Sequence, residues 1–244
     1  MRTQDLFKLT GTSLYDFDGR QCLPLLQWQS GAPVYARPHC QLTPGFNGGT
    51  LARIASLGWG SLIWEPKEFP IQGQWIEDGP LIPAEFARQS QDGRITLVLV
   101  ETERLVPSLW AVMDSVDLAS AVEALRSREN IPRKNVEKHV CRWSAGQPSP
   151  RLIPDLSEWA NTHDVAHVVW TGLSPKFDGA EITPSAEQVV EYLVKLTGEQ
   201  REKAERYVRL APRQIDTHYR RCIESSLHWH ALGGDSGRSN PSSE

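Results

Sequence analysis

The sequence predicts an α+β fold, in which a small sheet precedes most of the helices along the chain. Two observations lead to this prediction. Short apolar runs of strand length come first in the regular part of the chain, and longer segments with helical spacing dominate its end. Strands and helices do not alternate as in βαβ units. The apolar runs are also continuous, so we expect strands that are covered on both faces.

Five apolar runs carry the predicted strands. The clearest extends from Arg94 to Val100 and contains five branched aliphatic residues of strand-forming type. The five predicted strands are Leu51–Leu57, Arg94–Val100, Leu109–Met113, His139–Trp143 and Ala166–Thr171.

Four helices are predicted, of which three have apolar side chains at helical spacing and one is short and charged. Asp117 suits the N-cap of the first helix, and Pro132 follows its end. Pro184 and Ser185 open the second helix, and Gly198 is expected to close it. The apolar stripes and the charged segment lie at Leu118–Leu125, Ala186–Leu196, Glu199–Leu210 and Ile215–Trp229.

The length of 244 residues suits one domain with extensions. Residues 1–50 are rich in turn formers and lack sustained periodicity, so we expect an irregular N-terminal extension. Residues 51–231 form the predicted domain. Residues 232–244 are mostly Gly, Ser, Asn, Asp and Pro, which predicts a disordered tail.

The composition excludes several classes of protein. Hydrophobic residues make up 39% and charged residues 23%, which suits a packed core, and the net charge of −4 argues against nucleic-acid binding. No apolar stretch approaches the roughly 20 residues that span a bilayer, so no membrane partner is expected. The N-terminus lacks the apolar core of a signal peptide. The four cysteines form no Cys-x-x-Cys pair, so we expect a reduced, cytoplasmic protein.

A glycine-bracketed turn follows the first predicted strand. Gly58 and Gly60 flank Trp59, and together they allow a sharp turn and a close approach to a ligand. Successive N–H groups in such a turn form a nest for a carboxylate or an oxyanion, with Ser61 adding a hydroxyl before Leu62 returns to apolar packing. The alternative is a tight turn between strands with Trp59 in the core.

Glu129 continues the apolar stripe of the first helix. It lies four residues after Leu125, on the face that also carries Leu118 and Val122. Burial there would disfavour the charged carboxylate and raise its pKa, which suits general acid–base chemistry. Arg128 on the adjacent face would moderate this effect. The alternative is that the stripe ends at Leu125 and that Glu129 is solvated.

Two further kinds of site were considered. Arg88 ends the strand region around Phe86 and could bind a substrate carboxylate through two hydrogen bonds, although a surface arginine at a strand end would look the same. His228 and His230 lack an acidic or cysteine partner at ligand spacing, so no metal site is predicted.

The segments around the glycine turn and Glu129 together resemble a known family. Leu57–Trp64 resembles the Tyr-Gly-Ser-Leu signature of gamma-glutamylcyclotransferases, nearest the ChaC-type branch, where the loop likewise continues into an aliphatic residue and Trp. Leu125–Glu129 matches the Leu-x-x-Arg-Glu helix end that carries the catalytic Glu of the family. Pro83–Arg88 and Arg94–Val100 look like its second pair of strands. The resemblance covers residues 51–185.

This resemblance implies a small closed, barrel-like mixed sheet with flanking helices. It implies a lyase that releases 5-oxoproline from a small-molecule gamma-glutamyl substrate, with no metal or organic cofactor. Glu129 would be the general acid and base. The substrate would be held by the loop residues Gly58, Trp59, Gly60, Ser61 and Leu62.

Three departures from the family pattern leave alternatives open. Trp59 replaces the usual Tyr and lacks its hydroxyl, and Gln89–Gly93 replaces a segment rich in His, Arg, Gly and Pro. About 50 residues also precede the signature. One alternative is therefore a catalytically silent binding module of the same fold. Another is a partner-binding protein that acts through its N-terminal extension. Monomer and homodimer are equally compatible with the sequence.

Overall fold

The computed structural model describes residues 14–15, 21–22 and 52–232. Contacts within the chain divide it into two units, Met1–Thr50 and Leu51–Glu244. The elements described in the first unit are β1 (Leu14–Tyr15) and β2 (Gln21–Cys22), which pair antiparallel. The predictions of an irregular extension and of a disordered tail fall almost entirely outside the described residues.

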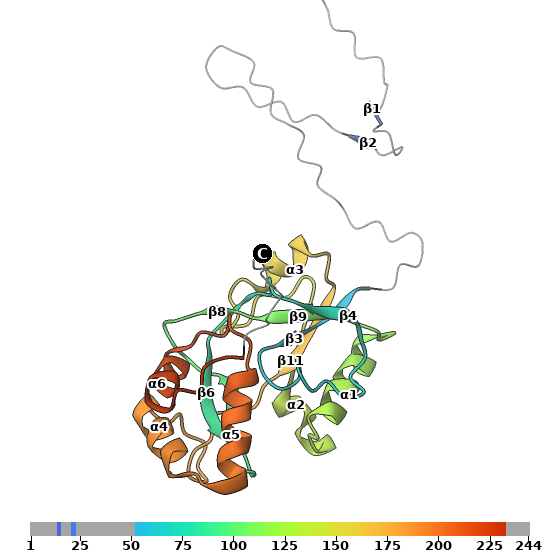
Figure 1. Cartoon of the computed structure of the whole chain (residues 1–244). Coiled ribbons are helices and arrows are strands. Elements are labelled where there is room, and N and C mark those ends of the chain that lie inside the picture. Colours follow the sequence, from blue (N-terminus) through green and yellow to red (C-terminus); the bar gives the residue numbers. More distant parts are fainter. Residues whose placement is uncertain (1–13, 16–20, 23–51, 233–244) are drawn as a thin grey trace, which may run out of the picture. The chain divides into compact units, whose positions relative to one another are not determined.

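A five-stranded mixed sheet organises the second unit (Figure 1). β3 (Ile54–Gly58) lies at its centre, parallel to β11 (His167–Thr171) and antiparallel to β9 (Leu109–Met113). The outer strands are β10 (Val140–Ser144), which pairs with β11, and β4 (Ile71–Ile76), which pairs with β9. Four of the five predicted strands therefore lie in this sheet, within one or a few residues of their expected bounds, whereas β4 was not predicted; the fifth, Arg94–Val100, corresponds to a strand outside this sheet, Ile95–Leu99.

Shorter ladders accompany this sheet. β5 (Leu81–Ile82) pairs with β8 (Val106–Pro107), and β6 (Ala84–Gln89) pairs with β7 (Ile95–Leu99). The predicted α+β class, with a mixed sheet and flanking helices, is confirmed. The closed barrel is not: among the described strands, the ladders form an open five-stranded sheet with separate two-stranded pieces.

The central strand is buried on both faces, as its continuous apolar sequence predicts. Successive side chains of a strand point to opposite faces. Ile54 accordingly packs into a cluster with Leu125 of the first long helix, whereas Ala55 and Leu57 pack into the larger cluster on the other face. The buried strand therefore holds the start of the following glycine loop in a fixed position.

Two helices lie beside β10 and β11. α1 (Leu118–Arg128) contacts both strands, and the Asp117 carboxylate caps it by accepting the N–H of Ser120 at 2.7 Å. A 3₁₀ turn (Arg133–Asn135) then leads into α2 (Val136–His139). The predicted start of the first helix is confirmed.

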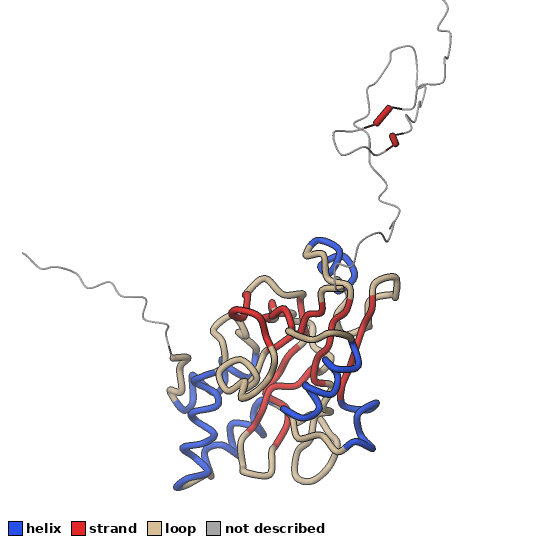
Figure 2. The backbone as a smooth tube through the Cα atoms, turned by 90° about the vertical axis from the view of Figure 1, so that its right-hand side faces the viewer, coloured by secondary structure: helices blue, strands red, loops and turns tan. Residues whose placement is uncertain are grey.

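The remaining helices follow later in the chain, and Figure 2 shows helices placed around the strands of the second unit. The Ser185 capping box opens α4, as predicted, but α4 ends at Lys195 and Gly198 begins α5 instead of closing α4. α4 packs on α6, and α6 contacts β6. The helices are α3 (Leu156–Thr162), α4 (Ala186–Lys195), α5 (Gly198–Leu210) and α6 (His218–Leu227). None of the helices within the described residues is long and apolar enough to cross a membrane.

Candidate active site

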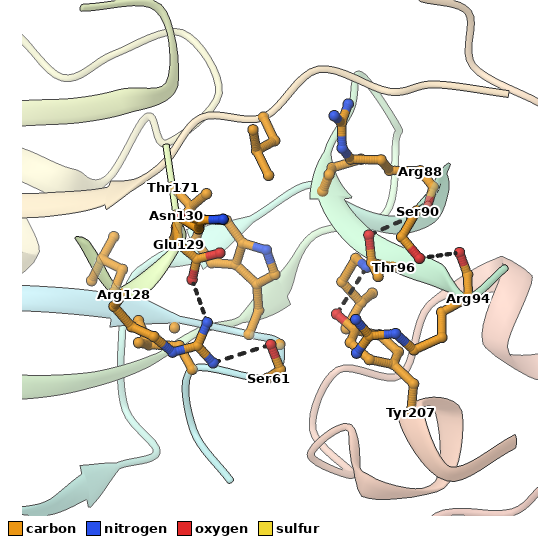
Figure 3. A pocket seen from close by; sticks show the side chains of 18 of the residues that line it. Ser61, Arg88, Ser90, Arg94, Thr96, Arg128, Glu129, Asn130, Thr171 and Tyr207 are labelled. Carbon is orange, nitrogen blue, oxygen red and sulfur yellow. Dashed lines mark hydrogen bonds and ion pairs between the residues drawn. The ribbon is translucent and has the colours of Figure 1, made fainter. Parts of the chain in front are cut away.

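One pocket of about 300 Å³ brings together all seven residues that the sequence analysis selected (Figure 3). It lies where the end of β3, the end of α1, the β6–β7 hairpin and α5 meet. The seven residues are Gly58, Trp59, Gly60, Ser61, Leu62, Arg88 and Glu129. The structure thus places them side by side, and their roles stay predictions.

The Gly58–Leu62 loop forms one wall of the pocket. A Cβ atom at Gly60 would lie 2.7 Å from the Tyr207 hydroxyl, and one at Gly58 would lie 2.7 Å from the Trp75 ring, so a larger residue at either position would displace an aromatic side chain. Trp59 is 5% exposed, so it packs into the core and lines the pocket at the same time.

The main chain of this loop has free donors. Within the described part of the chain, the N–H groups of Gly60, Ser61 and Leu62 donate to no protein acceptor. The loop closes on itself through other groups, because the Gly60 carbonyl accepts from the N–H of Ile63 at 3.0 Å. Successive unpaired N–H groups can hold a carboxylate or an oxyanion.

Glu129 stands at the C-cap of α1, and its side chain is 18% exposed. Burial raises the pKa of this carboxyl group, and the positive charges of Arg128 and Lys67 partly offset the rise. The geometry therefore favours the interpretation in which Glu129 faces inwards over the one in which it is solvated. A carboxyl group whose pKa is raised holds a proton more firmly, which suits a group that accepts a proton and later returns it.

Arg128 connects the carboxylate with the loop. Its Nη1 donates to Glu129 Oε1 at 3.1 Å, and its Nη2 donates to Ser61 Oγ at 3.2 Å and to the Glu65 carbonyl at 2.9 Å. The side chain is only 8% exposed. Its buried Nε has no protein acceptor within the described residues.

A bulge in β6 positions Arg88. The β6–β7 register shifts between Phe86 and Arg88, so Ala87 is an extra residue in the ladder. Arg88 Nη1 donates to the Ser174 carbonyl at 2.6 Å, and burial lowers the pKa of Arg88. Within the described residues it forms no ion pair.

Arg94 is a pocket residue that the sequence analysis did not select. Both carboxylate oxygens of Asp92 lie within 3.0 Å of its Nε, and its guanidinium carbon lies 5.5 Å from the centre of the Tyr207 ring. Burial alone would raise the pKa of Asp92, but hydrogen bonds from Arg94 and Ser90 lower it, so Asp92 stays charged. The ion pair occupies Nε and leaves the two terminal nitrogens without a protein partner among the described residues.

Tyr207 is a second pocket residue that the sequence analysis did not select. Burial raises its pKa to about 12, so the hydroxyl keeps its proton at neutral pH. This hydroxyl accepts the Leu97 N–H at 3.2 Å and lies against Gly60. The hydroxyl itself donates to no protein acceptor among the described residues, and Tyr207 lines the pocket.

The comparisons with known proteins found a distant structural likeness. No protein-family model matches the chain, and no curated protein matches it. Among solved structures, the chain is similar to gamma-glutamyl cyclotransferase specific to glutathione from yeast, with a TM-score of 0.42 and 13% identity over 72% of this chain and 98% of that one. A selenomethionine-labelled form of that yeast protein gives a TM-score of 0.39 and 14% identity over 73% and 97%.

Proposed function

We propose that this protein is a gamma-glutamylcyclotransferase-type lyase that cleaves a gamma-glutamyl amide into 5-oxoproline and the free amine. One observation carries the proposal: a buried carboxylate, Glu129, shares a pocket with a glycine loop that has free N–H donors. The sequence resemblance of the same two segments to the family signature supports it.

The chemistry follows from these groups. Glu129 takes a proton from the substrate α-ammonium, and the freed amine attacks the γ-carbonyl carbon to form a five-membered ring. Negative charge develops on the carbonyl oxygen, where N–H donors of the Gly58–Leu62 loop can stabilise it. The amide C–N bond then breaks as Glu129 gives its proton to the leaving nitrogen, and the ring nitrogen passes its second proton to the freed amine. The nucleophile belongs to the substrate, so holding amine and carbonyl together supplies much of the acceleration.

Mass-spectrometric detection of 5-oxoproline over a panel of gamma-glutamyl peptides and amines tests the proposal. We expect Glu129→Gln to lower turnover at least about 100-fold, which is the usual contribution of a general acid–base group. Glu123→Gln is the matched control, because Glu123 lies on the same helix but is exposed and paired with Arg126. A fully active Glu129→Gln protein would remove this residue from the mechanism.

The panel also separates the enzyme from a catalytically silent binding module. If the protein is a silent binding module, gamma-glutamyl compounds would raise its melting temperature without yielding 5-oxoproline. Tyr207 favours the catalytic alternative, because its hydroxyl stands against the loop in which Trp59 provides none.

A further inference from the structure

The charges of the pocket are unbalanced. Its lining carries four basic side chains, those of Lys67, Arg88, Arg94 and Arg128, against the single carboxylate of Glu129. Two further carboxylates lie nearby: Asp92 pairs with Arg94, and Glu181, whose charge acts on Arg88, pairs with Lys138 outside the pocket lining. A gamma-glutamyl head group is neutral overall, because it carries one ammonium and one carboxylate. The positive excess is therefore left for the other half of the substrate.

The two arginines on the β6–β7 hairpin are the groups that can receive this negative charge. Arg128 is committed to Glu129 and to the loop, and Lys67 is exposed. Arg88 and Arg94 instead lie across the pocket from Glu129 (Figure 3). Arg88 has no ion pair among the described residues, and Arg94 is held at its Nε only.

The surroundings of Arg94 resemble a prepared anion site. Asp92 fixes the Nε edge, and the Tyr207 ring lies beside the guanidinium, so little side-chain freedom remains to be lost on binding. The terminal nitrogens of a guanidinium fixed in this way match the geometry of a carboxylate.

We propose that Arg94 and Arg88 each bind one carboxylate of the leaving amine, so that the preferred substrates are gamma-glutamyl amides of an acidic amino acid. This inference rests on the proposed cyclotransferase function and specifies its substrate class. It makes Arg94 and Arg88 specificity-determining residues. The two carboxylates of an acidic leaving amino acid would balance the excess positive charge of the pocket, which the neutral gamma-glutamyl group does not balance.

Two peptides of nearly equal shape test the proposal: gamma-glutamyl-glutamate and gamma-glutamyl-glutamine, which differ by one carboxylate. We expect kcat/KM to favour the glutamate peptide by about 10- to 100-fold, the usual effect of a hydrogen bond to a charged group. Arg94→Gln should bring this ratio close to one. Arg88→Gln should instead lower kcat/KM for both peptides, because the carboxylate assigned to Arg88 is present in both. Arg142→Gln is the matched control, because Arg142 likewise pairs with one carboxylate, Glu137, but lies outside the pocket.

Arg94→Lys keeps the positive charge but lacks the two terminal nitrogens that can bind both oxygens of a carboxylate. We therefore expect a kcat/KM ratio between those of wild type and Arg94→Gln. Circular dichroism and melting temperature establish that each variant is folded. A wild-type ratio near one, or an unchanged ratio in folded Arg94→Gln, would overturn the assignment.

Calorimetric binding to the Glu129→Gln protein, in which the peptide is not consumed, provides a second readout. Tighter binding of the glutamate peptide supports the assignment of the two arginines, even if wild type cleaves neither peptide. Absence of cleavage by wild type would count against the cyclotransferase function and not against the arginine assignment. Equal affinity, or no binding of either peptide, contradicts the assignment. Equal turnover of both peptides would leave the cyclotransferase function standing and refute the substrate class.

Discussion

At the scale of single residues, Arg128 and burial act on Glu129 in opposite directions. Burial raises the pKa of the carboxyl group, whereas the neighbouring guanidinium lowers it. A general base must be deprotonated to work, but it must also hold the proton firmly enough to return it. The balance between the two effects therefore sets the pH range in which the proposed reaction runs.

Arg128→Gln tests this balance. Without the guanidinium, the pKa of Glu129 rises further. The rising limb of the kcat/KM profile therefore moves to higher pH, because the deprotonated carboxylate forms only at higher pH. Arg128→Lys keeps a positive charge and should leave the limb nearer its wild-type position. Arg133→Gln is the control, because that side chain is 83% exposed. An unmoved limb in Arg128→Gln would show that the limb does not report on Glu129.

Single residues also show which parts of the pocket can be selected from the sequence. Glu129 could be selected because its spacing from Leu125 places it on the buried face of one helix, which is a local property. The glycines could be selected because they are adjacent in sequence. Arg94 and Tyr207 carry no such local signal. Their meeting depends on α5 packing against β7, which links residues more than 100 positions apart.

At the scale of elements, a buried carboxylate from β6 supports the start of α6. Glu85 is 2% exposed and accepts the N–H groups of His218 and Tyr219 at 3.1 and 3.3 Å. These donors lie at the positive end of the helix dipole. Burial raises the pKa of Glu85, and hydrogen bonds from Thr217 and from the two N–H groups offset only part of the rise.

The stability of the fold should therefore depend on the ionisation of Glu85. The folded-state pKa lies above the unfolded value of about 4.3, so the folded state binds the proton more tightly. This contribution to stability is fully present at low pH and is lost as the pH rises through the folded-state pKa. In urea unfolding at a series of pH values, the unfolding free energy of wild type should fall relative to Glu85→Gln as the pH rises.

Glu199→Gln is a control of opposite sign. A hydrogen bond donated by Lys203 lowers the pKa of the exposed Glu199 carboxyl group. The unfolding free energy of wild type should therefore rise slightly relative to that of Glu199→Gln as the pH rises. A parallel pH dependence of wild type and Glu85→Gln would contradict the assignment for Glu85.

Elements were predictable where their signals are local. α1 has a capping Asp117 and a clear stripe, and β9 has an unbroken apolar run, so both were found. β4 was missed because four of its six residues are exposed and Gly73 adopts a positive φ of 73° within it. α3 was missed because its seven residues are too few for a helical period to stand out.

At the scale of the whole molecule, the described core lies within one unit. Among the described residues, the buried apolar clusters begin at Ile54 and end at Trp229. We therefore propose that residues 51–231 form the folding domain. A protein that begins at Leu51 should unfold in one cooperative transition, with a free energy within about 0.5 kcal/mol of the full chain, as for changes remote from the core.

Urea unfolding followed by circular dichroism measures this difference. Loss of the cooperative transition would show that the first 50 residues contribute to the core. A folded, active protein that begins at Leu51 but no longer captures a partner would instead support a binding role for that segment.

The parallel pairing of β3 with β11 has a consequence for how the chain reaches this structure. Ile54 pairs with His167, more than 100 residues later, and β3 leads directly into the Gly58–Leu62 loop. Pairing over such a sequence separation must overcome a large loop-closure entropy before any contact rewards it. On a ribosome, this pairing has to wait until β11 has been synthesised and released from the exit tunnel. The glycine loop is therefore encoded early but completed late, and a nascent chain that stops before β11 would carry the signature without the site.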